Sequence, residues 1–355
     1  MAISSITSVI ILLGILVFVH ELGHFLAAKY SGVGILKFSL GFGPRLLSRK
    51  LGETEYMISL VPLGGYVKML GESDDDDVNP EDESRSFHRQ SIWKKIAIVA
   101  AGPLSNFFFA IIVFSVIYGA GVPVLTSKVG SVQEGSAAAS AGLREGDRIT
   151  AIDGRSTSEW VEMAKSITES GGKPLRVQVE RGSTIVEFDV MPRPVVDHNI
   201  FGEEVTVYRI GISASSDTIT KTYDPWKAAS LGAAQAWTIA KLTVLSVVKM
   251  VQGIVSPRTI GGPIVIAKLS GEVAQQGLAP FFFFMAVLSV NLAILNLFPI
   301  PVLDGGHLLF YFIELVTGRE INIRWRERAQ QVGFFILILL MVFIFGNDLL
   351  TIWGN

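Results

Sequence analysis

Long stretches of apolar, almost uncharged sequence constrain this chain more than any other feature. Four of them reach the length of about 20 residues that a helix needs to cross the hydrocarbon of a bilayer, at about 5–28, 96–120, 279–301 and 329–352. Half of the 355 residues are hydrophobic and only 17% are charged, whereas about a quarter are charged in soluble domains. The sequence therefore predicts a membrane α-helical fold with four transmembrane helices.

Basic residues that flank the apolar stretches predict the orientation, because cytoplasmic loops are enriched in Lys and Arg. Three clusters fall on one side of a four-helix arrangement: Lys29, Lys37, Arg45, Arg49 and Lys50, then Arg85, Arg89, Lys94 and Lys95, then Arg319, Arg324, Arg326 and Arg328. We expect that side to be cytoplasmic and both termini to be extracytoplasmic. The acidic run 74–77, in a cytoplasmic loop at about 71–91, is expected to be solvated.

The segment at about 37–70 is rich in apolar, β-branched and aromatic residues with glycine between them. This composition predicts short strands in a hairpin. Irregular backbone at membrane depth needs polar partners from protein or from a wet cavity. Two interpretations stay open: a re-entrant hairpin that lines a cavity, or a small β-structure at the membrane interface.

The segment 126–194 has the composition of a water-soluble domain. Its run of small residues followed by Gly-Leu-x-x-Gly-Asp at 142–147 resembles a PDZ domain of the bacterial protease type. We expect this α+β domain to be extracytoplasmic. It would bind a peptide or substrate tail by adding a strand to a sheet edge, or act only as a steric gate.

The segment 195–277 is expected to be an extracytoplasmic linker that contains an amphipathic helix at about 226–256. Polar residues occupy one face of that helix at a period of 3.6 residues, which is typical of a helix in the membrane interface. A fifth transmembrane helix is the alternative. We reject it because Lys241 and Lys249 would be costly within the bilayer.

His20-Glu21-Leu22-Gly23-His24 is an H-E-x-x-H motif near the cytoplasmic end of the first apolar stretch. On a helix, His20 and His24 share one face and can bind one Zn²⁺, while Glu21 beside them can act as the general base. Ionisable groups within a membrane helix are expensive and are functional by default. The motif therefore predicts a zinc protease site.

Such a site needs a third protein ligand. The chain has no cysteine and only five histidines, and His88 and His198 lie in segments that are poorly placed for this role. The remaining candidates, Asp304 and His307, end the Asn296–His307 segment, where prolines and glycines break the third apolar stretch. Spacing alone does not choose between them. The net charge of −2 gives no indication of a nucleic-acid partner.

These features together resemble the site-2 protease family, and most of all its bacterial RseP group, which acts on anti-sigma factors. The resemblance rests on the H-E-x-x-H motif, the 62–67 stretch, the PDZ-like segment and the run 296–305. It implies that Asp304 is the third ligand of one zinc ion per chain, and that His307 either supports the ligands without binding the metal or is structural. It also implies that substrate is held by Asn296, Pro299, Gly64, Gly65 and Tyr66.

The resemblance further implies regulated intramembrane proteolysis in the bacterial inner membrane. Single-span membrane proteins, such as an anti-sigma factor, would be cut within the bilayer near its cytoplasmic side, after a prior extracytoplasmic cut. The chain departs from the best-known members in carrying one PDZ-like segment instead of two. A membrane PDZ scaffold without catalysis is the alternative function.

Overall fold

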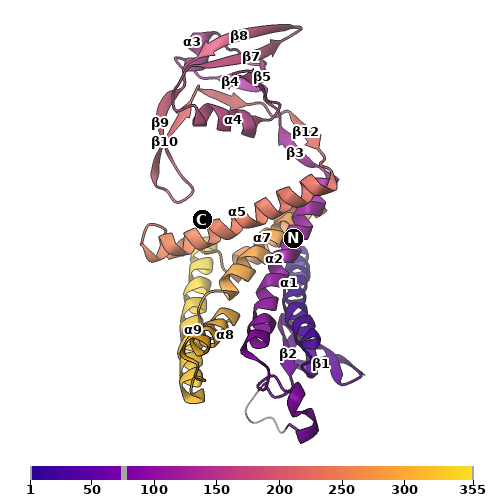
Figure 1. Cartoon of the computed structure of the whole chain (residues 1–355). Coiled ribbons are helices and arrows are strands. Elements are labelled where there is room, and N and C mark those ends of the chain that lie inside the picture. The colour runs from indigo at the N-terminus through magenta and orange to yellow at the C-terminus, as the bar shows by residue number, and fades with distance from the viewer. Residues whose placement is uncertain (1, 73–77, 354–355) are drawn as a thin grey trace. The chain divides into compact units, whose positions relative to one another are not determined.

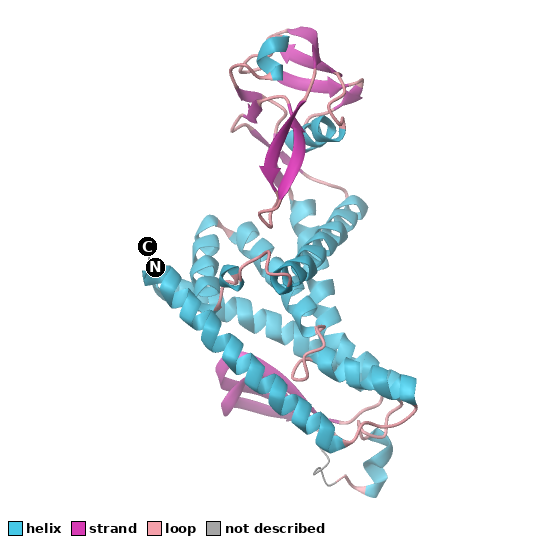
Figure 2. Cartoon of the chain, turned by 90° about the vertical axis from the view of Figure 1, so that its left-hand side faces the viewer, coloured by secondary structure: helices cyan, strands magenta, loops and turns pink. Residues whose placement is uncertain are grey.

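The computed structural model describes residues 2–72 and 78–353, so the acidic run 74–77 lies outside the described residues. The chain divides into two compact units. A helical unit comprises 1–117, 226–250 and 256–355, and a β-rich unit comprises 118–225 with 251–255. In Figure 2 the strands fall in two places, one beside the helices of the first unit and one throughout the second.

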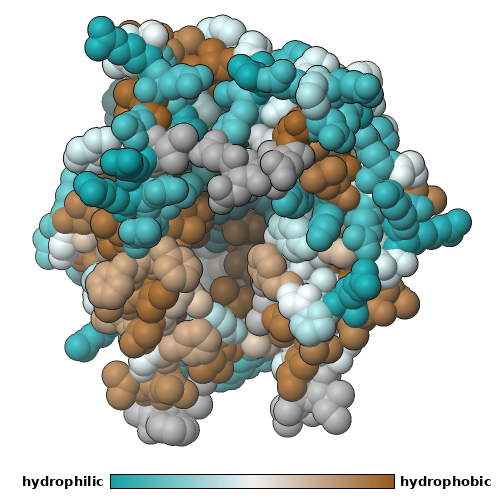
Figure 3. Space-filling view, turned by 90° about the horizontal axis from the view of Figure 1, so that it is seen from below, coloured by the Kyte–Doolittle hydropathy of each residue, from teal (hydrophilic) through white to brown (hydrophobic). Residues whose placement is uncertain are grey.

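All four apolar stretches are helical, as predicted: α1 (Ala2–Tyr30), α2 (Ile92–Ala120), α7 (Leu278–Asn296) and α9 (Ile323–Trp353). Helix α1 begins and helix α9 ends at the same end of the helical unit (Figure 1). The lower face of the protein carries hydrophilic side chains along one side and hydrophobic ones along the other, and it is hollowed between them (Figure 3).

Helix α5 (Pro225–Val251) covers the segment for which we predicted an amphipathic helix. It is long and apolar enough to cross a membrane, which makes five such helices in the described part of the chain. It nevertheless runs crosswise over its neighbours (Figure 1). Gly232 lies against Ser115 of α2, and eleven residues later Thr243 donates a hydrogen bond to Asn291 of α7 (2.6 Å).

The third apolar stretch is shorter than expected, because α7 ends at Asn296 and not near 301. Pro299 and Pro301 lack the N–H groups that would continue the helix. A new helix, α8 (Asp304–Thr317), begins one residue before the glycine pair, which we had interpreted as part of the break. Helix α6 (Pro263–Gln276) was also not anticipated, since its segment was assigned to a linker.

The predicted hairpin at 37–70 is present as β1 (Ile35–Leu51) paired antiparallel with β2 (Thr54–Met69). Its strands have 17 and 16 residues, so the prediction of short strands was wrong. Both strands bend, so residues 35–40 of β1 pair with 65–69 of β2 on one edge, and residues 37–40 pair with 55–58 on the other. Gly41 and Gly43 have φ of +89° and +86°, and Gly64 has φ of +125°. L-residues rarely adopt such angles, so the glycines of the sequence mark the bends.

The β-rich unit extends beyond the expected domain 126–194. It contains a four-stranded sheet of order β6-β5-β7-β8 and three strand pairs, β4 with β11, β3 with β12 and β9 with β10. Pairing of β11 and β12 with β4 and β3 means that residues assigned to a linker complete the unit. Its elements are β3 (Val122–Leu125), β4 (Val129–Val132), α3 (Ala137–Ala141), β5 (Arg148–Ile152), β6 (Arg155–Ser156), α4 (Trp160–Glu169), β7 (Leu175–Arg181), β8 (Thr184–Val190), β9 (Arg193–His198), β10 (Glu204–Arg209), β11 (Ile212–Ala214) and β12 (Thr218–Lys221).

The aspartate of the Gly-Leu-x-x-Gly-Asp run has a structural role in this unit. Asp147 is 1% exposed and accepts hydrogen bonds from Arg181 Nε (2.7 Å), Arg181 Nη2 (2.8 Å) and the Arg144 N–H (2.8 Å). Burial alone would raise the pKa of Asp147, but the hydrogen bonds from Arg181 and Arg144 outweigh it and hold this pKa below its usual range.

Asp147→Ala should destabilise the β-rich unit by about 3 kcal/mol at neutral pH, because it leaves Arg181 without its partner. The folded pKa lies below the unfolded value of about 4, so the carboxylate stabilises the fold above that pH. Its contribution is lost as pH falls through the folded pKa. Hydrogen exchange of residues 118–225 in the full chain should be slower in wild type than in Asp147→Ala, and this difference should shrink on acidification. A difference that does not change with pH would contradict this role.

A buried carboxylate joins α9 to the start of α6. Asp348 is fully buried and accepts hydrogen bonds from the N–H groups of Gly262 (2.9 Å), Ile264 (2.9 Å) and Val265 (3.3 Å). These are groups that a helix leaves unpaired at its N-terminus. A negative charge at this end is also favoured by the helix dipole. Asp348 therefore caps α6 from another helix.

Asp348→Ala should lower the free energy of unfolding by about 2 kcal/mol, because one buried and two partly buried N–H donors lose their acceptor. Asp348→Asn keeps one acceptor oxygen and should lose less. Denaturant unfolding of the purified protein in detergent measures both variants. Equal stability of Asp348→Ala and wild type would rule out the cap.

Candidate metal centre

Helix α1 presents His20 and His24 on one face, as the spacing predicts. Their ring centroids are 4.9 Å apart, and their Nε2 atoms are 3.3 Å apart. His24 Nδ1 donates to the carbonyl oxygen of Ile98 on α2 (2.9 Å). This hydrogen bond fixes the proton on Nδ1, so the lone pair of His24 Nε2 points into the space between the two rings.

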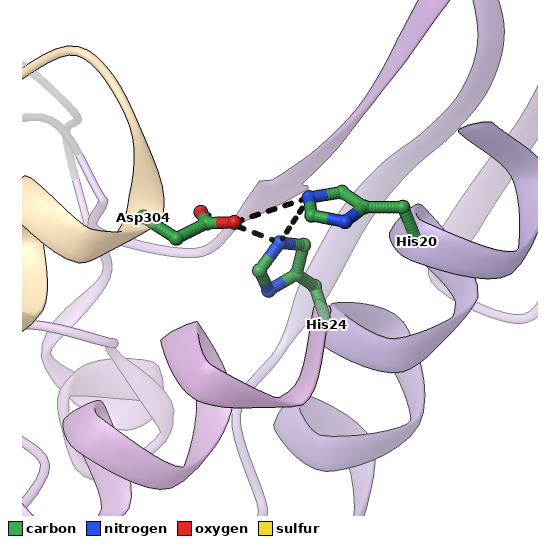
Figure 4. Close-up of side chains that lie close together, drawn as sticks. All are labelled: His20, His24 and Asp304. Carbon is green, nitrogen blue, oxygen red and sulfur yellow. Dashed lines mark hydrogen bonds and ion pairs between the residues drawn. The ribbon is translucent and has the colours of Figure 1, made fainter. Parts of the chain in front are cut away.

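Asp304 reaches the same space from the first turn of α8 (Figure 4). One carboxylate oxygen, Oδ2, lies 3.1 Å from His20 Nε2, and Oδ1 lies 3.5 Å from His24 Nε2. A Cβ on Gly305 would be 2.2 Å from the carbonyl oxygen of Phe298, and one on Gly306 would be 2.3 Å from that of Ile300. Glycine at both positions therefore lets the preceding loop fold onto α8 and deliver Asp304.

Among the described residues, His20, His24 and Asp304 form a group whose ligand atoms lie within 4.8 Å of one another. Two imidazole nitrogens and one carboxylate oxygen are donors that Zn²⁺ accepts, and catalytic zinc sites use three protein ligands with a fourth position open. The donor set and the tautomer of His24 both fit a zinc ion.

The group opens onto a cavity of about 580 Å³. Glu21 lines this cavity beside the histidines, and strand β2 passes directly over it. A Cβ on Gly65 would lie 2.9 Å from Glu21 Cγ, so only glycine permits so close an approach. The other lining residues include Tyr66, Glu72, His88, His307, Tyr311 and Arg326.

The remaining predicted residues are distributed differently. Gly65 and Tyr66 line the cavity with His307, whereas Gly64 lines a second cavity between α1 and the hairpin. Asn296 ends α7 and Pro299 lies in the loop that follows, and neither is among the described residues that line the cavity around Asp304. Their role in holding substrate stays a prediction.

The structure places the other two histidines in different surroundings. His88, which we had considered poorly placed, lines the cavity, because the segment after the acidic loop returns to the end of β2. The N–H of His88 there donates to the carbonyl oxygen of Gly71 (3.3 Å). His198 is the last residue of β9 in the β-rich unit.

Helix α2 contributes residues that we did not identify from the sequence. Ile98 holds His24, the ring of His24 covers Gly102, and Asn106 lies beside His20. A polar residue buried in an apolar stretch is a signal of function, and Asn106 could have been found in this way. Ile98 could not, because its contribution is a backbone carbonyl.

Comparison with known proteins agrees with this geometry. The model of the family described as Peptidase family M50 matches residues 8–340. A protein of Rhizobium meliloti, provisionally named a zinc metalloprotease, is 36% identical over 99% of this chain and 97% of its own length. The Regulator of sigma-E protease RseP of Escherichia coli and Protease RseP of Yersinia pestis are each 31% identical, over 97% of this chain and 98% of their own lengths.

The alignments with the two RseP proteins run over 446 and 442 positions, although this chain has 355 residues. These relatives therefore carry insertions that this chain lacks, whereas the alignment with the Rhizobium protein spans 364 positions. The family match and the identity over nearly the whole chain agree with one another. The chain belongs to peptidase family M50 and is a metalloprotease.

Proposed function

We propose that this protein is an intramembrane zinc endopeptidase in which His20, His24 and Asp304 bind one zinc ion. The observation that carries the proposal is the meeting of these three side chains, from helices about 280 residues apart in sequence, within 4.8 Å. His307 lines the same cavity without joining the group, which favours Asp304 as the third ligand.

Glu21 is the proposed general base. A bound zinc ion would polarise the scissile carbonyl and acidify water. The carboxylate of Glu21 takes a proton from the attacking water and passes it to the leaving amine. Its place in the cavity wall next to His20 and under Gly65 suits both transfers.

The hairpin offers a means of holding an unwound substrate. A helix keeps its own carbonyls in hydrogen bonds, so a transmembrane segment must become extended before it is cut. Residues 65–69 of β2 pair with β1 on one edge. In the described part of the chain their other edge pairs with no strand, and Gly65, Tyr66 and Val67 line the cavity. An extended substrate can add to such an edge.

The β-rich unit is proposed to be a single PDZ-like domain outside the cytoplasm. It has a cavity of about 530 Å³ lined by α4, β10 and β11, where a peptide or substrate tail would lie. Exclusion of large extracytoplasmic domains is the other role that we assign to it. Exclusion would make a prior extracytoplasmic cut a condition for cleavage.

The proposed topology has four transmembrane helices, both termini extracytoplasmic and α5 in the membrane interface of a bacterial inner membrane. The crosswise course of α5 over α2 and α7 supports this placement. The substrates are single-span membrane proteins. An anti-sigma factor is one candidate, since two relatives are named RseP and one of them is a regulator of sigma-E protease.

The test is cleavage of purified single-span proteins in detergent, with mass spectrometry to locate the cut. A cut within the transmembrane segment, lost on chelation and restored by zinc, is expected. A purified protein that contains zinc but cuts only outside the membrane segment would contradict the intramembrane assignment. A protein without bound zinc would favour the PDZ scaffold.

A further inference from the structure

Helix α2 lies unusually close to the face of α1 that carries the metal ligands. A Cβ on Gly23 would be 2.3 Å from the carbonyl oxygen of Ala101, so glycine is required at this crossing. Ser105 donates to the carbonyl oxygen of Val19 (2.7 Å). Groups on α2 are therefore held at fixed positions behind the two imidazoles.

His24 Nδ1, the ring nitrogen that faces away from the ligand group, has a hydrogen-bond partner on α2, the carbonyl oxygen of Ile98. A Cβ on Gly102 would lie 2.2 Å from His24 Nε2, so this glycine leaves room for the ring. The corresponding nitrogen of His20, Nδ1, faces Asn106, which follows Ile98 by eight residues, or about two helical turns.

Asn106 is fully buried and is held from a third helix, because its backbone carbonyl accepts a hydrogen bond from Ser289 of α7 (2.8 Å). Its Nδ2 lies 3.5 Å from His20 Nδ1, at the long limit for a hydrogen bond. Its Oδ1 is buried and has no hydrogen-bond partner. A buried oxygen without a hydrogen-bond partner is unfavourable, so this side chain is poorly satisfied as placed.

Metal binding through His20 Nε2 requires the oxygen of the Asn106 amide, and not its nitrogen, to face His20 Nδ1. A neutral imidazole that offers the Nε2 lone pair carries its proton on Nδ1, and this proton needs an acceptor. A half-turn of the Asn106 amide exchanges its nitrogen and oxygen and brings Oδ1 to face Nδ1. The same turn puts the amide nitrogen where the oxygen now has no partner, so what it gains is an acceptor for the Nδ1 proton.

We propose that Asn106 is a positioning residue that accepts the Nδ1 proton of His20 and so selects Nε2 for the metal. This inference rests on the proposed function, since it presumes zinc at His20, His24 and Asp304. Helix α2 then orients both histidine ligands, one through a backbone carbonyl and the other through a side-chain amide.

The test is zinc affinity of the full-length protein in detergent, measured by competition with a chelator. Asn106→Leu has a similar size but no acceptor, and it should bind zinc about 10- to 100-fold more weakly. Asn106→Asp can only accept at this position, and it should bind zinc at least as tightly as wild type. Ser105→Ala is the packing control, because it removes the α1–α2 hydrogen bond to Val19 without touching an imidazole. Weakening equal to that of Asn106→Leu would assign the effect to helix packing and overturn the role of Asn106.

Thermal unfolding of each metal-free variant separates loss of the ligand from loss of the fold. Equal affinity of wild type and Asn106→Leu would overturn the role of Asn106 and leave the proposed function intact. Equal weakening in Asn106→Leu and Asn106→Asp would also overturn it, since packing and not acceptor chemistry would then be at work. A wild type that binds no zinc would refute the proposed function itself.

Discussion

Glu21→Gln should lower the rate of peptide cleavage by about 100- to 10,000-fold, the contribution typical of a general base. The amide has nearly the shape of the carboxylate but cannot take a proton from water. The protein should keep its fold and its zinc, because Glu21 is not in the ligand group. Single-turnover cleavage of a single-span substrate in detergent, with zinc content measured on the same sample, gives both results.

Glu72→Gln is the matched control for this experiment. Glu72 lines the same cavity, and its carboxylate accepts a hydrogen bond from the backbone N–H of Met69 (3.0 Å), which a glutamine oxygen can also accept. We expect its cleavage rate to stay within a few-fold of wild type. Retained cleavage in Glu21→Gln, or an equal loss in Glu72→Gln, would show that Glu21 is not the base.

Asp304→Ala should abolish binding of zinc at stoichiometric concentration. Loss of a residue that only hydrogen-bonds to a metal ligand already lowers metal affinity 10- to 100-fold. Loss of one of the three direct ligands should lower it further. Elemental analysis of the purified variant, followed by chelator competition, measures the effect. Cleavage should be lost to the same extent and should not return at moderate zinc excess.

His307→Ala is the variant that distinguishes the two sequence candidates for the third ligand. His307 lies one turn after Asp304 on α8 and lines the same cavity, but it is outside the group of ligand atoms. We expect this variant to keep one zinc per chain. Unchanged zinc in Asp304→Ala together with lost zinc in His307→Ala would reassign the ligand.

Local pattern was sufficient to predict several elements of the fold, but not α6, α8 or the strands after β8. The four apolar helices, the glycine-rich hairpin and the helix at 225–251 all follow from hydrophobicity and period, which are properties of neighbouring residues. Boundaries were less predictable. Helix α8 starts at Asp304, and the preceding loop packs on the glycine pair that follows. Strands β11 and β12 are recognisable as parts of the β-rich unit only through their partners β4 and β3.

The candidate site likewise combines residues that the sequence identifies with residues that only the structure identifies. His20, Glu21 and His24 could be identified from the sequence alone, because a helix places positions i and i+4 on one face whatever surrounds it. Tertiary structure decided three contacts: that of Asp304 with the two histidines, that of Ile98 with His24 and that of Asn106 with His20. Each depends on distances between segments that are 74 to about 280 residues apart, and chain packing sets such distances while local pattern does not.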